Sequence, residues 1–150
     1  MELWELNARE SIRDLVARYN ANGDTGRFAQ VVALFAPDAV METQGDGGTF
    51  VTYRGHTEIE SIFTGAREHF GADAAQRSVA PYLRHHTSTL QIDLVDQTHG
   101  TGRCYYQVLM VHGLDHWGRY FDRYEERDGR WLFTHRRVTT DGRSALVPRS

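Results

Sequence analysis

The chain has 150 residues, of which 40% are hydrophobic and 25% charged, a composition typical of one globular domain. Its formal net charge of -3 argues against binding to nucleic acid or to an anionic membrane, because both require a clustered basic surface. All 17 basic residues are arginines, so no lysine can form a Schiff base or anchor pyridoxal phosphate.

Cysteine content and hydropathy bear on the compartment. Cys104 is the only cysteine, and the sequence shows neither a signal-like N-terminal stretch nor a run of about 18 apolar residues. We therefore expect a cytoplasmic protein without a membrane span. The last letters, "ALVPRS", resemble the thrombin recognition sequence of expression vectors. We assign residues 145–150 to a tag remnant and residues 1–144 to a single domain.

The first predicted element is an amphipathic helix within "NARESIRDLVARYN". Asn7 is a candidate N-cap, and Glu10 follows it at the spacing of a capping box. The apolar residues after it recur at helical spacing, and they are Ile12, Leu15, Val16 and Tyr19. We expect this helix to end at Gly23, because glycine readily adopts the left-handed conformation of a C′ residue.

A short second helix is predicted next, and Pro37 closes it. Its apolar face consists of Phe28, Val31, Val32 and Phe35. Two short strands should follow over residues 39–45 and 49–55, because "AVMETQG" and "TFVTYRG" flank a glycine-bearing turn.

The third predicted helix, residues 56–70, begins with a capping box of Thr57 and Glu60. Beyond it the pattern changes to strand-like segments separated by Gly and Asp turns. These segments cover residues 82–95, 99–112, 117–127 and 130–140. Helices followed by antiparallel strands predict an α+β fold. We expect a cone-shaped α+β barrel, in which a curved, mostly antiparallel sheet wraps around one long and two shorter helices.

The order of the motifs resembles a known family across nearly the whole chain. The motifs are "Y…GD", "LFAPDAVMET", "YRGHTEI", "HHTSTLQI", "GRCYYQV" and "WGRYFDRYEERDGRWLFTHRRV". They resemble the SnoaL-like branch of the nuclear transport factor 2-like superfamily. That branch includes bile acid 7α-dehydratase, hexachlorocyclohexane dehydrochlorinase, scytalone dehydratase, polyketide cyclases and noncatalytic relatives. The resemblance implies the cone fold, whereas the reaction has to be argued from the site.

Asp24 has two interpretations. It could be an N-cap of the second helix, or its carboxylate could belong to an active site. The resemblance implies that it pairs with a histidine on the first long strand, and the register of "TLQI" selects His85 rather than His86. Neighbouring residues on a strand face opposite sides, so only one of the two histidines can point into the cone. A carboxylate would orient the imidazole, leaving its other nitrogen free to take a proton from carbon.

Six further residues are candidates for substrate binding. Strand parity places Arg136 with Leu132 and Val138 on an apolar-leaning face, where it could stabilise a leaving group, an enolate or a carboxylate. The resemblance also implies a function for this arginine and for Tyr19. The remaining candidates would form the walls of the cavity, and they are Met41, Cys104, Tyr106 and Tyr120.

The sequence thus predicts a lyase or isomerase that needs no cofactor or metal. HExxH, GxSxG and GxGxxG motifs are missing, as are phosphate-binding glycine loops and Cys/His clusters. We expect Asp24 and His85 to abstract a proton from a small hydrophobic, cyclic or aromatic substrate, with elimination as in dehydratases. A polyketide-type ring cyclase is one alternative, and a noncatalytic domain like the β subunits of ring-hydroxylating dioxygenases is the other. The resemblance and the broad sheet predict a homodimer or homotrimer.

Overall fold

The computed structural model describes residues 1–45, 47–76 and 82–145. The elements in chain order are α1 (Leu3–Gly23), α2 (Phe28–Val32), β1 (Phe35–Gln44), β2 (Phe50–Arg54), α3 (Gly55–Gln76), β3 (Leu83–Leu94), β4 (His99–Met110), β5 (Gly113–Arg127), β6 (Arg130–Val138) and β7 (Gly142–Arg143). The predicted α+β class is confirmed. The predicted tag remnant lies outside the described residues except for Ala145.

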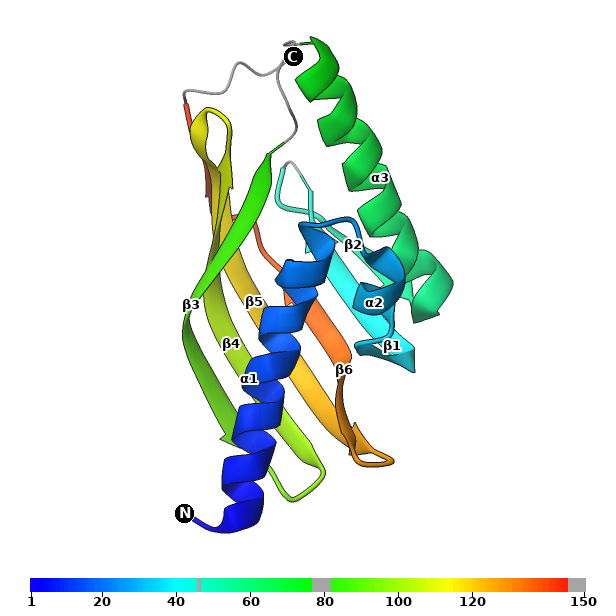
Figure 1. Cartoon of the computed structure of the whole chain (residues 1–150), viewed down its shortest axis with the longest axis vertical. Helices are drawn as coiled ribbons and strands as arrows, with labels where there is room; N and C mark the ends of the chain where they lie inside the picture. Colours follow the sequence, from blue (N-terminus) through cyan, green and yellow to red (C-terminus); the bar gives the residue numbers. More distant parts are fainter. Residues whose placement is uncertain (46, 77–81, 146–150) are drawn as a thin grey trace.

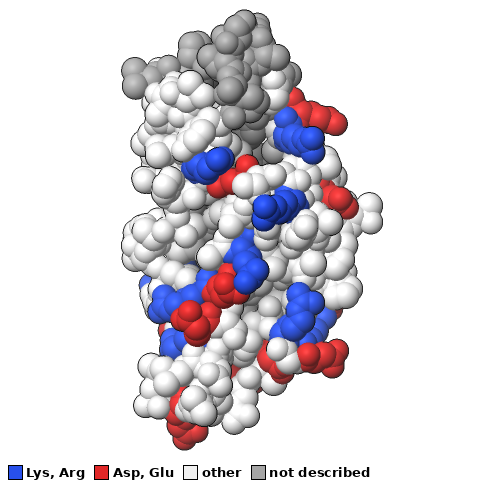
Figure 2. Space-filling model, viewed as in Figure 1, with Lys and Arg blue, Asp and Glu red and all other residues white. Residues whose placement is uncertain are grey.

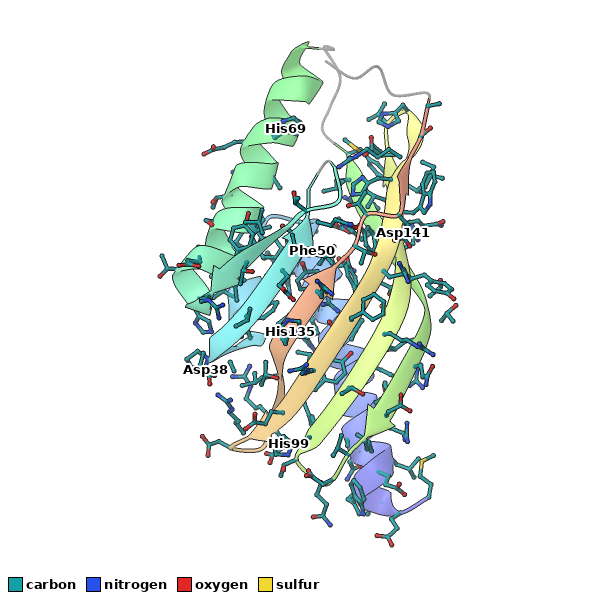
Figure 3. The ribbon with its side chains drawn as sticks, turned by 180° about the vertical axis from the view of Figure 1, so that it is seen from behind. Asp38, Phe50, His69, His99, His135 and Asp141 are labelled. Atoms are coloured by element: carbon teal, nitrogen blue, oxygen red, sulfur yellow. The ribbon has the colours of Figure 1, made fainter. Side chains whose placement is uncertain are left out.

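The strands form one seven-stranded sheet in the order β2-β1-β6-β5-β4-β3, and β7 pairs with β5. The β1–β6 pair is parallel, and the other pairs are antiparallel. The sheet curves around α1 without closing, and α3 lies along its β1–β2 side (Figure 1). Viewed from behind, β4, β5 and β6 present a face that none of the described helices covers (Figure 3).

Helix α1 fills the concave face of the sheet. Its buried residues follow helical spacing and are Ala8, Ile12, Leu15, Val16, Tyr19 and Asn20. The helix begins earlier than predicted, at Leu3, with a capping box of Glu2 and Glu5 in place of Asn7 and Glu10. The Arg9 guanidinium donates a 2.7 Å hydrogen bond to the carbonyl oxygen of Ile92 in β3, which ties the N-terminal half of the helix to the sheet.

The lengths of the other helices also differ from the prediction. With 22 residues, α3 is slightly longer than the 21-residue α1, so the described fold has two long helices and one short one. Helix α3 continues through Gly71 because a helical glycine costs only about 1 kcal/mol and the following "ADAA" contains strong helix formers. Its first turn is held by Glu58, whose carboxylate accepts the Arg54 N–H, and not by the predicted Thr57/Glu60 box.

Phe35 begins β1 instead of belonging to the short helix. Its ring packs 5.0 Å from that of Phe133 in the parallel neighbour β6. The ladder is irregular between Phe35 and Val40, and Pro37 lies within that interval. A proline can enter a strand there because its missing N–H removes no regular ladder bond.

Candidate functional site

A cavity of about 960 Å³ opens between the end of α1, α3 and the concave face of the sheet. Apolar side chains such as Phe28, Ile62 and Phe63 form much of its wall. Polar groups enter it from the end of α1, from β3 and from the β4–β5 region. Cavities of this size and composition suit small organic ligands.

Asp24 and His85 meet at this cavity through two hydrogen bonds. The Nδ1–H of His85 donates to Oδ1 of Asp24 over 2.6 Å, and the backbone N–H of His85 donates to Oδ2 over 2.8 Å. An ionised carboxylate only accepts, so it fixes the Nδ1–H tautomer and leaves Nε2 as the unprotonated nitrogen. The next residue on the strand, His86, is exposed. The register of β3 therefore turns His85 toward the cavity and His86 away from it.

The N-cap interpretation of Asp24 is wrong. Asp24 is the C-cap of α1, with helical φ and ψ of -64° and -23°, while the N-cap of α2 is Arg27 and makes no side-chain capping bond. The helix ends at Gly23 as predicted, but Gly23 is not left-handed; the left-handed residue in this turn is Gly26, with φ of 76°. The two oxygens of Asp24 are thus free of capping and bind His85.

The predicted aromatic wall is present in the cavity lining, together with Met41. The rings of Tyr106 and Tyr120 are stacked 4.7 Å apart, and the Tyr106 hydroxyl donates to the carbonyl oxygen of Thr139. Burial raises the pKa of Tyr19 to about 12, and it also raises the pKa values of the other two tyrosines. These phenols therefore stay protonated near neutral pH.

Arg136 and Cys104 do not line the cavity. Arg136 is fully buried, and its Nε and Nη2 donate to the two oxygens of Asp122 over 2.7 and 2.8 Å. Burial lowers the pKa of Arg136, but the charge and the hydrogen bonds of Asp122, together with the nearby Tyr19 and Tyr120, outweigh this effect and the net pKa is raised. Burial likewise raises the pKa of the Cys104 thiol to about 11. Strand parity was right that Arg136 faces inward, but the sheet interior around Arg136 and Cys104 is packed core.

Asn20 is a cavity residue that the sequence interpretation missed. Its Oδ1 accepts a 3.2 Å hydrogen bond from the Tyr120 hydroxyl. Its Nδ2 is buried and has no hydrogen-bond partner among the described residues. A buried amide donor without a partner is uncommon, and it adds an unfilled donor to the polar wall. In the sequence Asn20 is indistinguishable from other polar residues of α1.

A second cluster of titratable residues, also missed, lies at the start of β5. His112 Nε2 and His116 Nδ1 each donate to a different oxygen of Asp115, over 2.9 and 2.6 Å. Both histidines line the cavity. The sequence signal for this cluster was the short motif "HGLDH", residues 112–116. It was missed because the strand was expected to begin only at residue 117, whereas β5 begins at Gly113. Pairing with β4 and β7 extends β5 back to Gly113 and brings this motif onto the sheet.

No group of three or more His, Cys, Asp or Glu side chains suited to holding a metal ion occurs within the described residues. None of the described helices is both long and apolar enough to cross a membrane. Acidic and arginine side chains alternate over the face seen in Figure 2, which shows no extended patch of one sign.

The model of the SnoaL-like domain matches residues 4–137, nearly the whole described fold. The chain belongs to the SnoaL-like family. Similar solved structures include the hexachlorocyclohexane dehydrochlorinase LinA-type3 from Novosphingobium barchaimii LL02, at 18% identity and a TM-score of 0.76 over 100% of this chain and 99% of that one. A comparison with curated proteins found no match to this SnoaL-like domain.

Two further similar structures come from Novosphingobium aromaticivorans DSM 12444. One is a proposed scytalone dehydratase, at 20% identity and a TM-score of 0.76, covering 100% of this chain and 95% of that one. The other is the β subunit of a proposed aromatic-ring-hydroxylating dioxygenase, at 19% identity and a TM-score of 0.71, covering 92% of each chain. At these identities, the similarity shows that the SnoaL-like domain shares their fold.

Proposed function

We propose that this SnoaL-like domain is a cofactor-independent lyase or isomerase in which Nε2 of His85 removes a proton from carbon. The observation that carries the proposal is the double hydrogen bond between Asp24 and His85 at the cavity wall. The carboxylate holds the ring in one tautomer and stabilises the imidazolium that forms on proton transfer. Asp24 is then the positioning residue, and His85 is the base.

The lining of the cavity favours a small hydrophobic substrate with a cyclic or aromatic ring. Phe28, Phe63 and Tyr106 offer flat apolar surfaces, and Asn20 offers an amide next to the buried phenols. An amide N–H directed at a carbonyl oxygen would stabilise the enolate that forms when the neighbouring carbon loses its proton. The base and the apolar walls therefore fit elimination from a ring that carries an activating carbonyl group.

The fold is shared with dehydrochlorinase and dehydratase structures, and also with a dioxygenase β subunit. The paired Asp24 and His85 favour the enzyme, because a subunit that only supports a partner needs no oriented imidazole at a cavity. A ring cyclase would use the same base, and it remains the second candidate. A homodimer or homotrimer stays a prediction.

Hydrogen exchange tests the proposal before the natural substrate is known. The wild-type protein in deuterated water should exchange the acidic C–H of a cyclic enone or β-hydroxy ketone, as followed by NMR. Replacing His85 by Ala removes the base, and Asp24→Asn removes the charge that stabilises the imidazolium. We expect both variants to slow exchange by about 10²–10⁴-fold at equal ligand binding.

His86→Ala is the matched control, because His86 is the exposed neighbour on the same strand. It should exchange the ligand at the wild-type rate. Exchange that survives both His85→Ala and Asp24→Asn would refute the proposal, and a wild-type protein that binds the ligands without exchanging them would favour the noncatalytic alternative.

A further inference from the structure

The second cluster lies beside the first on the same wall of the cavity, because His85 in β3 pairs with Val108 in β4 and Val108 pairs with His116 in β5. The ring centroids of His85 and His116 lie 6.5 Å apart, with an interplanar angle of 88°. Each ring donates its Nδ1–H to its own aspartate over 2.6 Å. Hydrogen bonds within the described residues leave Nε2 unengaged in both rings. Both imidazoles therefore line one cavity, each bound at Nδ1 by an aspartate and each without a hydrogen-bond partner at Nε2 among the described residues.

The structure assigns His116 as the acid that protonates the leaving group, with the substrate lying over both His85 and His116 in the cavity. This inference rests on the proposed function. Nε2 of His85 takes the proton from carbon, and the C–H electron pair forms the new C=C bond. The C–O bond breaks with its electron pair on oxygen, and that oxygen takes a proton from Nε2 of the His116 imidazolium. The products are an alkene and water, and the proton on His85 returns to His116 through solvent.

The surroundings of His116 suit this role. Asp115 is buried, with 8% of its surface exposed, and it accepts from His112 and His116 on separate oxygens, so its carboxylate is held in place. Burial lowers the pKa of His116, although Asp115 opposes this effect, so its imidazolium is a stronger acid than a free one and the step uses the protonated fraction, which grows as the pH falls. Tyr106, whose ring lies 6.1 Å from both imidazoles, forms the wall between them.

An acid at this position specifies the class of leaving group. Hydroxide is a poor leaving group that departs as water once it is protonated, whereas chloride departs without a proton. The inferred substrate is therefore a cyclic β-hydroxy carbonyl compound, with its acidic C–H toward His85 and its hydroxyl toward His116. This geometry favours dehydration over loss of a halide.

The test compares two leaving groups on one ring, a 3-hydroxycyclohexanone and a 3-chlorocyclohexanone, by the ultraviolet absorbance of the enone above the uncatalysed rate. His116→Asn keeps an N–H donor near the Nδ1 position for Asp115 but removes Nε2. We expect it to slow loss of water by about 100-fold and to change loss of chloride by less than about threefold. His85→Asn should slow both reactions.

His99→Asn serves as the control, because His99 forms an exposed pair with Asp96 at the far end of the sheet (Figure 3). It should leave both rates unchanged. Equal losses for water and chloride in His116→Asn, or no loss for either, would overturn the assignment. A wild-type protein that exchanges C–H in a His85-dependent way but eliminates neither group would also overturn it, while leaving the proposed function intact. Absence of His85-dependent exchange would refute both.

Discussion

Two acid–base pairs inside the domain have similar hydrogen-bond lengths and different surroundings. Asp24 and His85 lie at the cavity, where their side chains are 7% and 21% exposed. Asp122 and Arg136 are sealed in the core, with both side chains 0% exposed. The difference teaches that a short bond between ionisable groups does not identify a site, whereas access for a ligand does.

The core pair is built for packing. The Arg136 guanidinium lies over the rings of Tyr19, Tyr120 and Phe133, with its carbon about 4 Å from each ring centre. The Tyr124 hydroxyl donates to the same Asp122 carboxylate over 2.9 Å. Tyr124 reaches it because residue 102 is glycine: a Cβ there would lie 2.5 Å from the Tyr124 oxygen. Asp122 is therefore surrounded by partners on its own side of the sheet.

The largest expected effect is on the core pair. Arg136→Met leaves the Asp122 charge buried without its cation, so we expect the free energy of unfolding in urea to fall by about 3–5 kcal/mol. The double variant Asp122→Leu/Arg136→Met should recover most of that loss, because it removes both charges. A single variant as stable as the wild type would show that the pair does not hold the core together.

A smaller effect on stability is expected at the cavity pair. Asp24→Asn can still accept the His85 backbone N–H, and the carboxylate caps no helix. Its free energy of unfolding should therefore change by about 1 kcal/mol or less. The rate of C–H exchange should still fall by the factor given above. A urea midpoint lowered as much as that of Arg136→Met would instead make Asp24 a structural residue like Asp122.

The smallest effect concerns pH. The folded-state pKa of His116 lies below its ordinary value of about 6.5, so the unfolded chain binds more protons here as the solution is acidified. The free energy of unfolding that depends on neutral His116 is fully present above about pH 6.5, and it is lost as the pH falls through the folded-state pKa. The free energy of unfolding in urea should be measured at neutral and at mildly acidic pH. We expect it to fall less on acidification in His116→Asn than in the wild type. An equal fall in both proteins would show that the pKa of His116 is not lowered by folding.

Helical and alternating hydrophobic patterns in the sequence predicted the α+β class, the element order and the strand bounds to within a few residues. Those patterns are local and survive in any fold that buries one face of each element. Cap positions were predicted less well. The start of α1 coincides with a Glu2/Glu5 capping box that the sequence interpretation overlooked, and the start of β5 depends on pairing with β4.

The sequence by itself determined which residue types were available: arginine without lysine, one cysteine, and an aspartate and histidine in positions that resemble a family pair. Only the tertiary structure decided that the Asp24 carboxylate binds His85, that Arg136 is sealed by Asp122, and that His116 lies beside His85. The physical reason is that inward direction on a strand is a local property. Whether an inward side chain meets a cavity or packed core depends on how far the helices fill the curved sheet at that level.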